Sequence, residues 1–334
     1  MRAAAAVTAV AHPNIALVKY WGKRDERLVV PLADSLSLTL DAFPTTTSVQ
    51  LRPDGSRDVV VVDGQPATGE VLRRITGFLD VLRAHARRRE PARVDTRNTV
   101  PVGAGLASSA AGFAALALAG AGAYEIGLDA TGLSRLARRG SGSAARSVFG
   151  GFVLWHAGPA DAEDADLASY AEPLHDARVD LAMVAVLLQT GPKPVSSREA
   201  MRRTVATSPL FSGWLAASRT DITAMRAALA EGDLATVGEI AERNALGMHA
   251  TMETASPPVA YRTHASHQVL DHVRRMRDRG EQTWSTMDAG PNVKVLCTAV
   301  DAQRIAAELG EITGCLTVVA RSGPGATVTT GVGT

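Results

Sequence analysis

The sequence lacks a large excess of charge of either sign, and this absence excludes several classes of partner. Its 334 residues carry 35 basic and 34 acidic side chains, which gives a net charge of +1 and a pI near 7.9. No overall electrostatic field therefore draws the chain to nucleic acid or to an anionic membrane. Any binding of anions is expected at local clusters of basic groups. Only four basic residues are lysines, and all lie in motif-like segments: Lys19, Lys23, Lys193 and Lys294.

Long apolar runs and cysteines are also scarce. The longest apolar segments, such as residues 113–124, are too short to span a bilayer. Cys297 and Cys315 lie in apolar strand-like segments, and we expect reduced core thiols rather than a disulfide. Residues 1–14 contain one arginine and a short alanine run, which is a poor match to a signal peptide. We therefore expect a soluble cytoplasmic protein.

Three common catalytic signatures are missing. No Gly-Lys-Ser/Thr ending follows the glycine-rich segment at 101–109, which disfavours an ordinary P-loop NTPase. No Gly-x-Ser-x-Gly elbow follows a strand, so a serine hydrolase is poorly supported. The histidines have neither metal nor triad spacing, and a structural role is the default for His249 in its amphipathic helix. Because no Cys/His pattern resembles a zinc site, we expect no structural metal.

Hydrophobic periodicity predicts an α+β fold with separate helical and sheet layers, and the length suits two domains. Strands dominate the first part and helices the part after residue 190. The chain then ends in the order strand, strand, helix, strand. The predicted strands include 14–22, 35–43, 45–52, 58–64, 92–100, 150–157 and 181–188, and the predicted helices include 69–88, 107–124, 234–252 and 266–279.

The strongest local signal is the segment PVGAGLASSAAGFAALALA at 101–119. A glycine-rich turn lets a backbone approach a ligand closely, and free N–H groups at the start of the following helix suit phosphate oxygens. The hydroxyls of Ser108 and Ser109 are candidates to hold phosphate or Mg²⁺. The alternative is a small-residue helix packed against a sheet, and this segment alone leaves both interpretations open.

A second serine- and glycine-rich helix start occurs at 138–151, in RRGSGSAARSVFGG. Ser141 and Ser143 offer hydrogen-bond donors, and the planar guanidinium of Arg146 can bind a carboxylate or a phosphate in a bidentate manner. Taken singly, an exposed basic loop explains this segment better. Two such starts close together in the sequence favour a substrate with more than one anionic group.

Three charged residues lie in or beside predicted strands. Lys19 is predicted in an apolar, aromatic strand, where a lysine buried without an anion would be costly. Lys23 has charged neighbours, so a solvated strand face explains it better. Asp288 lies between two predicted strands at a Gly-Pro-Asn break, where it is either a turn cap or a catalytic group.

Several of these segments resemble the sequence motifs of one protein superfamily. PVGAGLASSAAG matches the Pro-x-x-x-Gly-Leu-x-Ser-Ser-Ala phosphate loop of the GHMP small-molecule kinase superfamily. Within that superfamily, the chain resembles the mevalonate diphosphate decarboxylase family from about residue 11 to residue 325. The family segments, in the family's order, are HPNIALVKYWGKRDE, PLADSLSLTL, SGSAARSVFGGF, GPKPVSS, ERNALGMHATM and MDAGPNVKVL.

The resemblance implies a fold and a reaction. An N-terminal ATP-binding domain, here 1–187, would pack against a ferredoxin-like C-terminal domain, here 188–334, with the active site in the cleft between them. ATP and (R)-mevalonate 5-diphosphate would give isopentenyl diphosphate, CO₂, ADP and phosphate. ATP and Mg²⁺ are the implied cofactors, and a homodimer is the implied assembly. Neither nucleic acid nor a membrane is an expected partner.

The resemblance also implies roles for individual residues. Asp288 matches the catalytic aspartate that orients or deprotonates the 3-hydroxyl, Lys19 would neighbour it, and Arg146 would bind the substrate carboxylate. The other residues implied at the substrate are Asn14, Tyr20, Lys23, Ser141, Ser143, Lys193 and Ser196. Those implied at ATP are Gly103, Gly105, Leu106, Ser108 and Ser109, with the two serines also candidates for Mg²⁺.

The sequence departs from the family pattern at two positions. Ala145 stands where the family has Ser or Cys, and Asp34 stands where Ser, Thr or Asn is commoner. Neither departure removes a charged catalytic group. The alternatives are a phosphomevalonate decarboxylase, a mevalonate 3-kinase-like enzyme, and a catalytically silent ligand-binding or regulatory relative. Charged residues at all three central positions argue against the silent relative.

Overall fold

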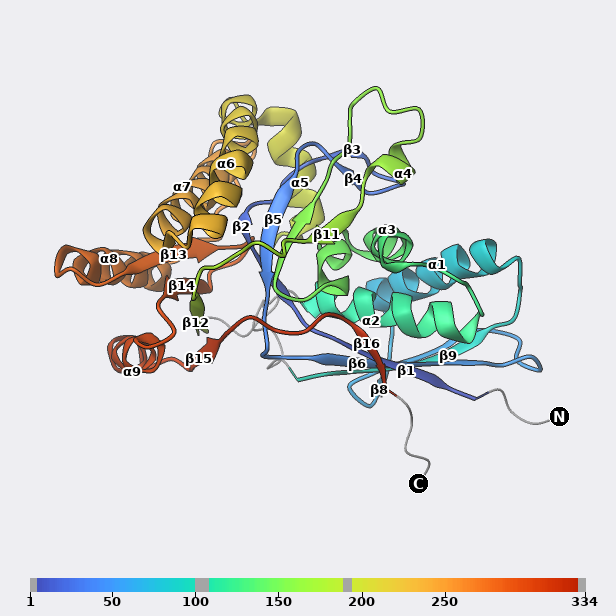
Figure 1. Ribbon diagram of the computed structural model, residues 1–334. Helices are drawn as coiled ribbons and strands as arrows, with labels where there is room; N and C mark the ends of the chain where they lie inside the picture. Colours follow the sequence, from blue (N-terminus) through green and yellow to red (C-terminus); the bar gives the residue numbers. More distant parts are fainter. Residues whose placement is uncertain (1–4, 100–107, 189–193, 330–334) are drawn as a thin grey trace.

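The computed structural model describes residues 5–99, 108–188 and 194–329, and it confirms the predicted α+β fold. Figure 1 shows the N-terminal part, a sheet with helices above it, on the right, and the helical C-terminal part on the left. Within the described residues, no helix combines the length and the apolar character needed to cross a membrane.

A six-stranded sheet forms the base of the N-terminal part. Strand β6 (Thr45–Leu51) alternates buried and half-buried residues, as a sheet with one covered face requires. Helices α1 (Gly69–Ala86) and α2 (Ser108–Ala123) cover that face, and the small side chains of α2 allow close packing. The strands in spatial order are β16 (Thr327–Thr329), β1 (Val7–Ala11), β6, β9 (Ala92–Asn98), β7 (Val59–Val62) and β8 (Gln65–Pro66).

A second sheet lies between the two parts of the molecule. Every residue of β2 (Asn14–Val18) and β5 (Ser35–Thr39) is buried, because both faces of this sheet are covered. The alternation in SLSLT places serines on one face and leucines on the other. The strand order is β11 (Ala171–Pro173), β10 (Phe152–Trp155), β5 and β2. Nearby lie β3 (Lys23–Asp25), β4 (Val30–Pro31), α3 (Ala130–Gly140), the 3₁₀ helix η1 (Gly142–Val148) and α4 (Ala165–Ala168).

The C-terminal sheet is sandwiched between helices. Helices α8 (His264–Asp278) and α9 (Ala302–Thr313) pack on one face, and α6 (Phe211–Glu231) and α7 (Leu234–Glu253) pack on the other. Gly238 lets α7 approach the sheet, because a Cβ there would lie 2.1 Å from the ring of Trp284. The strand order is β13 (Thr283–Met287), β14 (Val293–Cys297), β12 (Ala182–Val186) and β15 (Thr317–Ala320); α5 (Ser197–Thr207) precedes α6.

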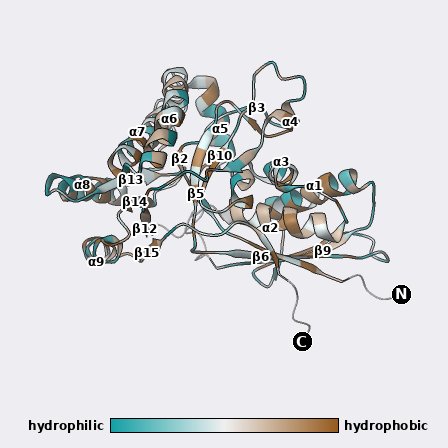
Figure 2. Cartoon of the chain, viewed as in Figure 1, coloured by the Kyte–Doolittle hydropathy of each residue, from teal (hydrophilic) through white to brown (hydrophobic). Residues whose placement is uncertain are grey.

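One apolar core joins the two parts. Leu36 and Leu38 of β5 pack in the same cluster as Val237 of α7 and Trp284 of β13. The end of the chain also returns to the N-terminal sheet, where β16 pairs with β1. Figure 2 shows α2 in brown and pale tones and α8 largely in teal, which reflects the buried position of α2 and the exposed outer face of α8.

The structure corrects one local prediction. Strand β2 ends at Val18, so Lys19 follows the strand instead of lying in it. The short helix predicted within 138–151 is present as the 3₁₀ helix η1. Helices α5 and α6 were not delimited from the sequence. The boundary at 187 stays a prediction, and β12, which precedes it, pairs with strands that follow it.

Candidate active site

A cavity of about 290 Å³ lies where residues from both parts of the chain meet. The end of β2, the start of η1, the start of α5 and the loop between β13 and β14 contribute to its wall. The fold thus brings together side chains that are remote in the sequence. The predicted site residues that line this cavity are Asn14, Lys19, Tyr20, Lys23, Ser109, Ser141, Ser143, Arg146, Ser196 and Asp288.

Asp288 follows β13 and is held by two lysines. Its Oδ1 lies 3.0 Å from Nζ of Lys19, and its Oδ2 lies 3.1 Å from Nζ of Lys294. The Asp288 side chain is 29% exposed, whereas both lysine side chains are 2% exposed. Burial by itself raises the pKa of Asp288, but the charges of Lys19 and Lys294 outweigh burial and hold that pKa below its ordinary range. The carboxylate is therefore ionised.

Lys19 is fixed through both its backbone and its side chain. Its backbone N–H donates to Oδ1 of Asn244 at 2.9 Å, and its Nζ donates to the carbonyl oxygen of Ala16 at 2.8 Å. Burial lowers the pKa of Lys19 to about 8, although the charge of Asp288 opposes this shift. The ammonium group is therefore charged at neutral pH and loses its proton in mildly alkaline solution.

Arg146 in η1 is a buried cation whose neighbours are neutral. Its Nε donates to Oδ1 of Asn14 at 3.2 Å and to Oγ of Ser37 at 2.9 Å, and its Nη1 donates to Oγ of Ser35. Burial lowers its pKa to about 10, against the opposing charge of Asp288. No carboxylate among the described residues forms an ion pair with it. A 2% exposed guanidinium in this situation indicates a site for an anion.

Serines and Tyr20 form the wall next to Arg146. A Cβ on Gly142 would lie 2.8 Å from the Tyr20 ring, so the glycine lets the turn between Ser141 and Ser143 pack on that ring. The Tyr20 hydroxyl has no partner among the described residues, and burial raises its pKa above the ordinary range. Oγ of Ser141 also lies 3.3 Å from Oγ of Ser109.

Two arginines that the sequence did not indicate as site residues also line the cavity. Arg74 of α1 and Arg198 of α5 both donate to the carbonyl oxygen of Gly140, at 3.3 and 3.4 Å. Burial lowers the pKa of Arg74 to about 10, and the charge of Arg198 adds to this shift. Lys23 supplies a further cation, paired with Glu26 at 2.7 Å. In the sequence, arginines on amphipathic helices look like ordinary solvent-facing residues.

Lys294 was also missed as a site residue, although the sequence contained a signal. It interrupts the apolar run VKVLC six residues after Asp288, and it is one of only four lysines. Its partner across the β13–β14 pair is Thr286, two residues before Asp288. Because side chains at alternate strand positions share a face, this register brings the lysine to the carboxylate.

Some predicted residues lie outside the described part of the chain: Gly103, Gly105, Leu106 and Lys193. Ser108 is the first residue of α2, and only its backbone is described. Ser196 caps α5, because its hydroxyl accepts a hydrogen bond from the N–H of Glu199 at 3.2 Å.

A second cavity, of about 220 Å³, adjoins the first, and the two share Arg74 and Ser109. Its wall is mainly apolar and comes from β7, β9, α1 and α2. Such an arrangement suits a ligand with a flat apolar group and an anionic tail. The other residues that line it include Val62, Val71, Ile75, Phe113 and Leu116.

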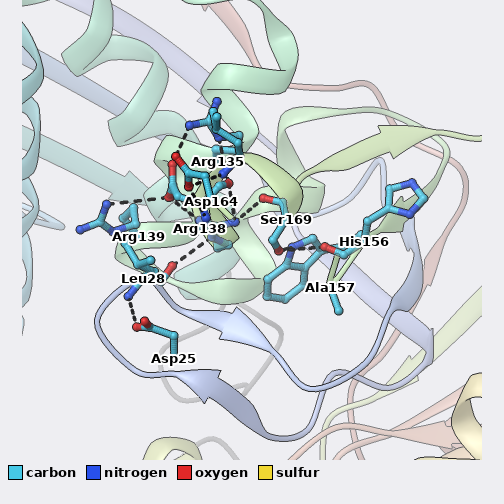
Figure 3. A network of polar contacts seen from close by, with 12 residues as sticks. Asp25, Leu28, Arg135, Arg138, Arg139, His156, Ala157, Asp164 and Ser169 are labelled. Atoms are coloured by element: carbon cyan, nitrogen blue, oxygen red, sulfur yellow. Dashed lines mark hydrogen bonds and ion pairs between the residues drawn. The ribbon is translucent and has the colours of Figure 1, made fainter. Parts of the chain in front are cut away.

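A buried arginine fixes the segment that carries Lys23. Arg138 is 0% exposed, and its Nε donates to the carbonyl oxygen of Leu28 at 3.0 Å, in the turn between β3 and β4 (Figure 3). Its Nη groups bind the carbonyl oxygen of Ser169 and the carboxylate of Asp166. Burial lowers the pKa of Arg138 to about 10, and Asp166 opposes this shift. The network therefore ties the β3–β4 hairpin to α3.

Two family models match the chain. The model of the diphosphomevalonate decarboxylase-like N-terminal domain matches residues 11–168, and that of the mevalonate 5-diphosphate decarboxylase C-terminal domain matches residues 182–322. The chain is 36% identical to the diphosphomevalonate decarboxylase of Homo sapiens, over 87% of this chain and 76% of that protein. It is 34% identical to that of Aspergillus fumigatus, over 92% of this chain and 80% of that protein.

Solved structures of mevalonate diphosphate decarboxylases are also similar to this chain. The mevalonate diphosphate decarboxylase of Enterococcus faecalis is 41% identical, with a TM-score of 0.90 over 98% of this chain and 99% of that one. That of Staphylococcus aureus is 38% identical, with a TM-score of 0.91 over 97% and 98%. A complex with MVAPP, AMPPCP and magnesium is 41% identical, with a TM-score of 0.91 over 98% and 99%. The similarity extends over both parts of the chain, which therefore belongs to the diphosphomevalonate decarboxylase family.

Proposed function

We propose that the cavity between the two parts of the chain is where (R)-mevalonate 5-diphosphate is decarboxylated with ATP and Mg²⁺. The observation that carries this proposal is the ionised Asp288, held between two lysines, beside Arg146, a buried cation without an acidic partner among the described residues. The products are isopentenyl diphosphate, CO₂, ADP and phosphate. The reaction belongs to the mevalonate pathway of isoprenoid biosynthesis.

The chemistry of the substrate explains why ATP is needed. A 3-hydroxy carboxylate has no carbonyl or imine that accepts the electrons left behind when CO₂ departs. Phosphorylation of the tertiary hydroxyl turns it into a leaving group. The electron pair of the breaking carbon–carbon bond then forms the new double bond as phosphate leaves. Bound Mg²⁺–ATP supplies the γ-phosphoryl group for this activation.

Asp288 accepts a hydrogen bond from the 3-hydroxyl and orients it toward the phosphoryl group. Because its pKa is held below the ordinary range, this carboxylate is a weak base in the resting enzyme, and orientation is its main contribution. Transition states of phosphoryl transfer are largely dissociative, so the hydroxyl proton leaves late and passes to Asp288 as the new O–P bond forms. Lys19 and Lys294 hold the carboxylate in place, and Lys19 offsets charge on the transferring group.

Arg146 binds the carboxylate of the substrate. Asn14, Ser35 and Ser37 hold the guanidinium in place through neutral oxygens, so its positive charge is left for a ligand. Its Nη2 has no hydrogen-bond partner among the described residues and is the donor proposed to reach the substrate. The carboxylate leaves as neutral CO₂, so the strong ionic attraction ends with the reaction.

The basic side of the cavity suits the 5-diphosphate. Lys23, Arg74 and Arg198 supply charge there, and Tyr20 lies in the same wall. Several cations in one wall match the charge of a diphosphate better than that of a monophosphate. We also propose contacts with this end of the substrate from Ser141, Ser143, Lys193 and Ser196.

The start of α2 is the proposed phosphate site for ATP. This helix has 16 residues and no acidic side chain in its first turn, so its N-terminal N–H groups and dipole favour an anion. Ser109 would hold Mg²⁺–ATP together with Ser108, and Gly103, Gly105 and Leu106 would complete the loop. The apolar second cavity, which shares Ser109 with the first, would take the adenine.

We further propose a homodimer in the cytoplasm, with two domains that meet near residue 187. The cytoplasmic assignment is supported by the two free cysteines, of which Cys297 is buried and Cys315 is half-buried. The dimer is proposed from the family resemblance alone. Light scattering on the purified chain measures its mass in solution, and a monomer at micromolar concentration contradicts the dimer.

The test of the proposed function is a substrate panel with the purified protein and Mg²⁺–ATP. We expect CO₂ and ADP in equal amounts from mevalonate 5-diphosphate, and much less of either from mevalonate 5-phosphate or mevalonate. ADP release without CO₂ contradicts the decarboxylase. A preference for the 5-phosphate contradicts the assignment of the basic wall to a diphosphate.

A further inference from the structure

Helix α7 binds the backbones of both residues of the Lys19–Asp288 ion pair. Oδ1 of Asn244 accepts the backbone N–H of Lys19 at 2.9 Å, and Nε2 of His249 lies 3.1 Å from the carbonyl oxygen of Asp288. Asn244 is 2% exposed and His249 is 0% exposed. Five positions along a helix correspond to about 7.5 Å, so one rigid element spans both contacts.

The orientation of the Asn244 amide is fixed by its other partners. Its Nδ2 donates to Oγ of Ser218 at 3.0 Å and to Oδ2 of Asp221 at 2.9 Å. Asp221 only accepts, so the amide nitrogen must face it and the amide oxygen must face Lys19. The indole N–H of Trp214 also donates to the backbone oxygen of Asn244 at 3.0 Å. Both the side chain and the backbone of Asn244 are therefore held by α6.

The protonation state of His249 follows from its partner. A carbonyl oxygen only accepts, so Nε2 carries the proton and donates a hydrogen bond to the backbone carbonyl oxygen of Asp288. Burial lowers the pKa of His249 to about 4, and the charge of Arg262 adds to this shift, so the ring is neutral at physiological pH. Its Nδ1 is buried and has no hydrogen-bond partner among the described residues. The bond to Asp288 is therefore the one hydrogen bond of the His249 ring among the described residues.

We propose that Asn244 and His249 are positioning residues that set the separation and orientation of Lys19 and Asp288. The two residues of the pair follow strands of different sheets: Lys19 follows β2, and Asp288 follows β13. Helix α7 packs against both strands and bonds to both backbones. It thereby fixes one group relative to the other before the substrate binds, as phosphoryl transfer requires.

This inference rests on the proposed decarboxylase function, and His249 offers a matched test. The amide nitrogen of His249→Gln reaches the position of Nε2, whereas His249→Met fills a similar volume without a donor. We expect His249→Met to lower kcat at least tenfold with KM values for both substrates within about threefold, and His249→Gln to recover most of the loss. Val237→Ala, a core truncation on α7 away from the site, is the control: it lowers the thermal midpoint and leaves kcat unchanged.

Three outcomes overturn the proposal. They are a kcat of His249→Met within twofold of the natural protein, equal losses in the Met and Gln variants, and a loss confined to KM. If His249→Met does not fold, His249→Asn replaces it, since its shorter amide does not reach Asp288. A crystal structure of the low-activity variant supplies a readout without turnover, and an unchanged Lys19–Asp288 distance also overturns the proposal. Absence of decarboxylation by the unmodified protein instead contradicts the proposed function.

Discussion

Replacing Asp288 with asparagine removes the shared counter-ion of two buried lysines. The carboxylate lies 3.0 Å from Lys19 and 3.1 Å from Lys294, whose side chains are each 2% exposed. At an effective dielectric constant of about 20, each pair interacts by roughly 5 kcal/mol before the cost of desolvation. Removal of one partner from a buried pair costs about 3–5 kcal/mol in measured cases. We therefore expect Asp288→Asn to lose both turnover and stability.

The loss of stability has an upper limit, because a lysine left without its anion can release its proton. From an ordinary pKa of 10.5, deprotonation at pH 7 costs about 5 kcal/mol per lysine. We take 3–5 kcal/mol as the total expected loss, since Asp288 is 29% exposed and water partly screens the change. At about 2 °C for each kcal/mol in a chain of this size, the thermal midpoint falls by roughly 6–10 °C.

The difference in stability between Asp288→Asn and the natural protein is expected to depend on pH. In the natural protein the pKa of Lys19 is about 8, and without Asp288 it falls further, because the carboxylate raises it. At pH values between the pKa of Lys19 in the variant and about 8, which is its pKa in the natural protein, the folded variant binds fewer protons than the folded natural protein. The stability of the variant therefore rises faster with pH in this window. The difference in thermal midpoint is largest in mildly acidic solution and narrows as the pH approaches 8.

Thermal melts from pH 6 to pH 9, with ADP and CO₂ release on the same samples, test this reasoning. The control is Asp271→Asn, whose carboxylate is 57% exposed and pairs with Arg274 on the surface, so its midpoint shifts by the equivalent of less than about 1 kcal/mol. A midpoint for Asp288→Asn within 2 °C of the natural protein at pH 7 refutes the counter-ion argument. If the difference in thermal midpoint between the two proteins widens toward pH 8, the predicted direction of the pH dependence is wrong. Retained decarboxylation refutes the catalytic role of Asp288.

Two further predictions concern the lysines. Lys294→Met keeps an unbranched side chain, one atom shorter, but removes the charge-assisted bond to Asp288. We therefore expect kcat to fall about 10- to 100-fold. We expect nucleotide affinity, measured by calorimetry, to stay unchanged, and an unchanged kcat argues against a role for Lys294. Because the pKa of Lys19 in the ligand-free protein is about 8, kcat/KM falls as the pH rises through 8, and Lys19→Arg, which keeps its proton, moves any remaining activity to higher pH. A pH–rate profile that stays flat from pH 7 to pH 10 contradicts this assignment.

The sequence predicted the layers of this protein well, because they follow from local patterns. The alternating SLSLT segment, the Ala-rich run after Ser108 and the amphipathic pattern at 234–252 each predicted the element that the structure contains. Lys19 was placed in a strand because its apolar neighbours suggested that β2 continues. The strand ends at Val18, where the backbone N–H of Lys19 turns to Asn244 instead. A contact with a helix more than 200 residues away has no local signal.

The sequence by itself determined the fold class, the family and the charged groups of the site, since motif chemistry and hydrophobic period are encoded over short spans. Only the tertiary structure decided how those groups act on each other. The second lysine on Asp288, the neutral surroundings of Arg146 and the two contacts from α7 depend on strand register and helix packing. The low pKa of Asp288 and the pKa of about 8 for Lys19 arise from burial and from distances of about 3 Å between residues remote in the chain. Electrostatic energy depends on these distances and on the exclusion of water, and folding alone sets both.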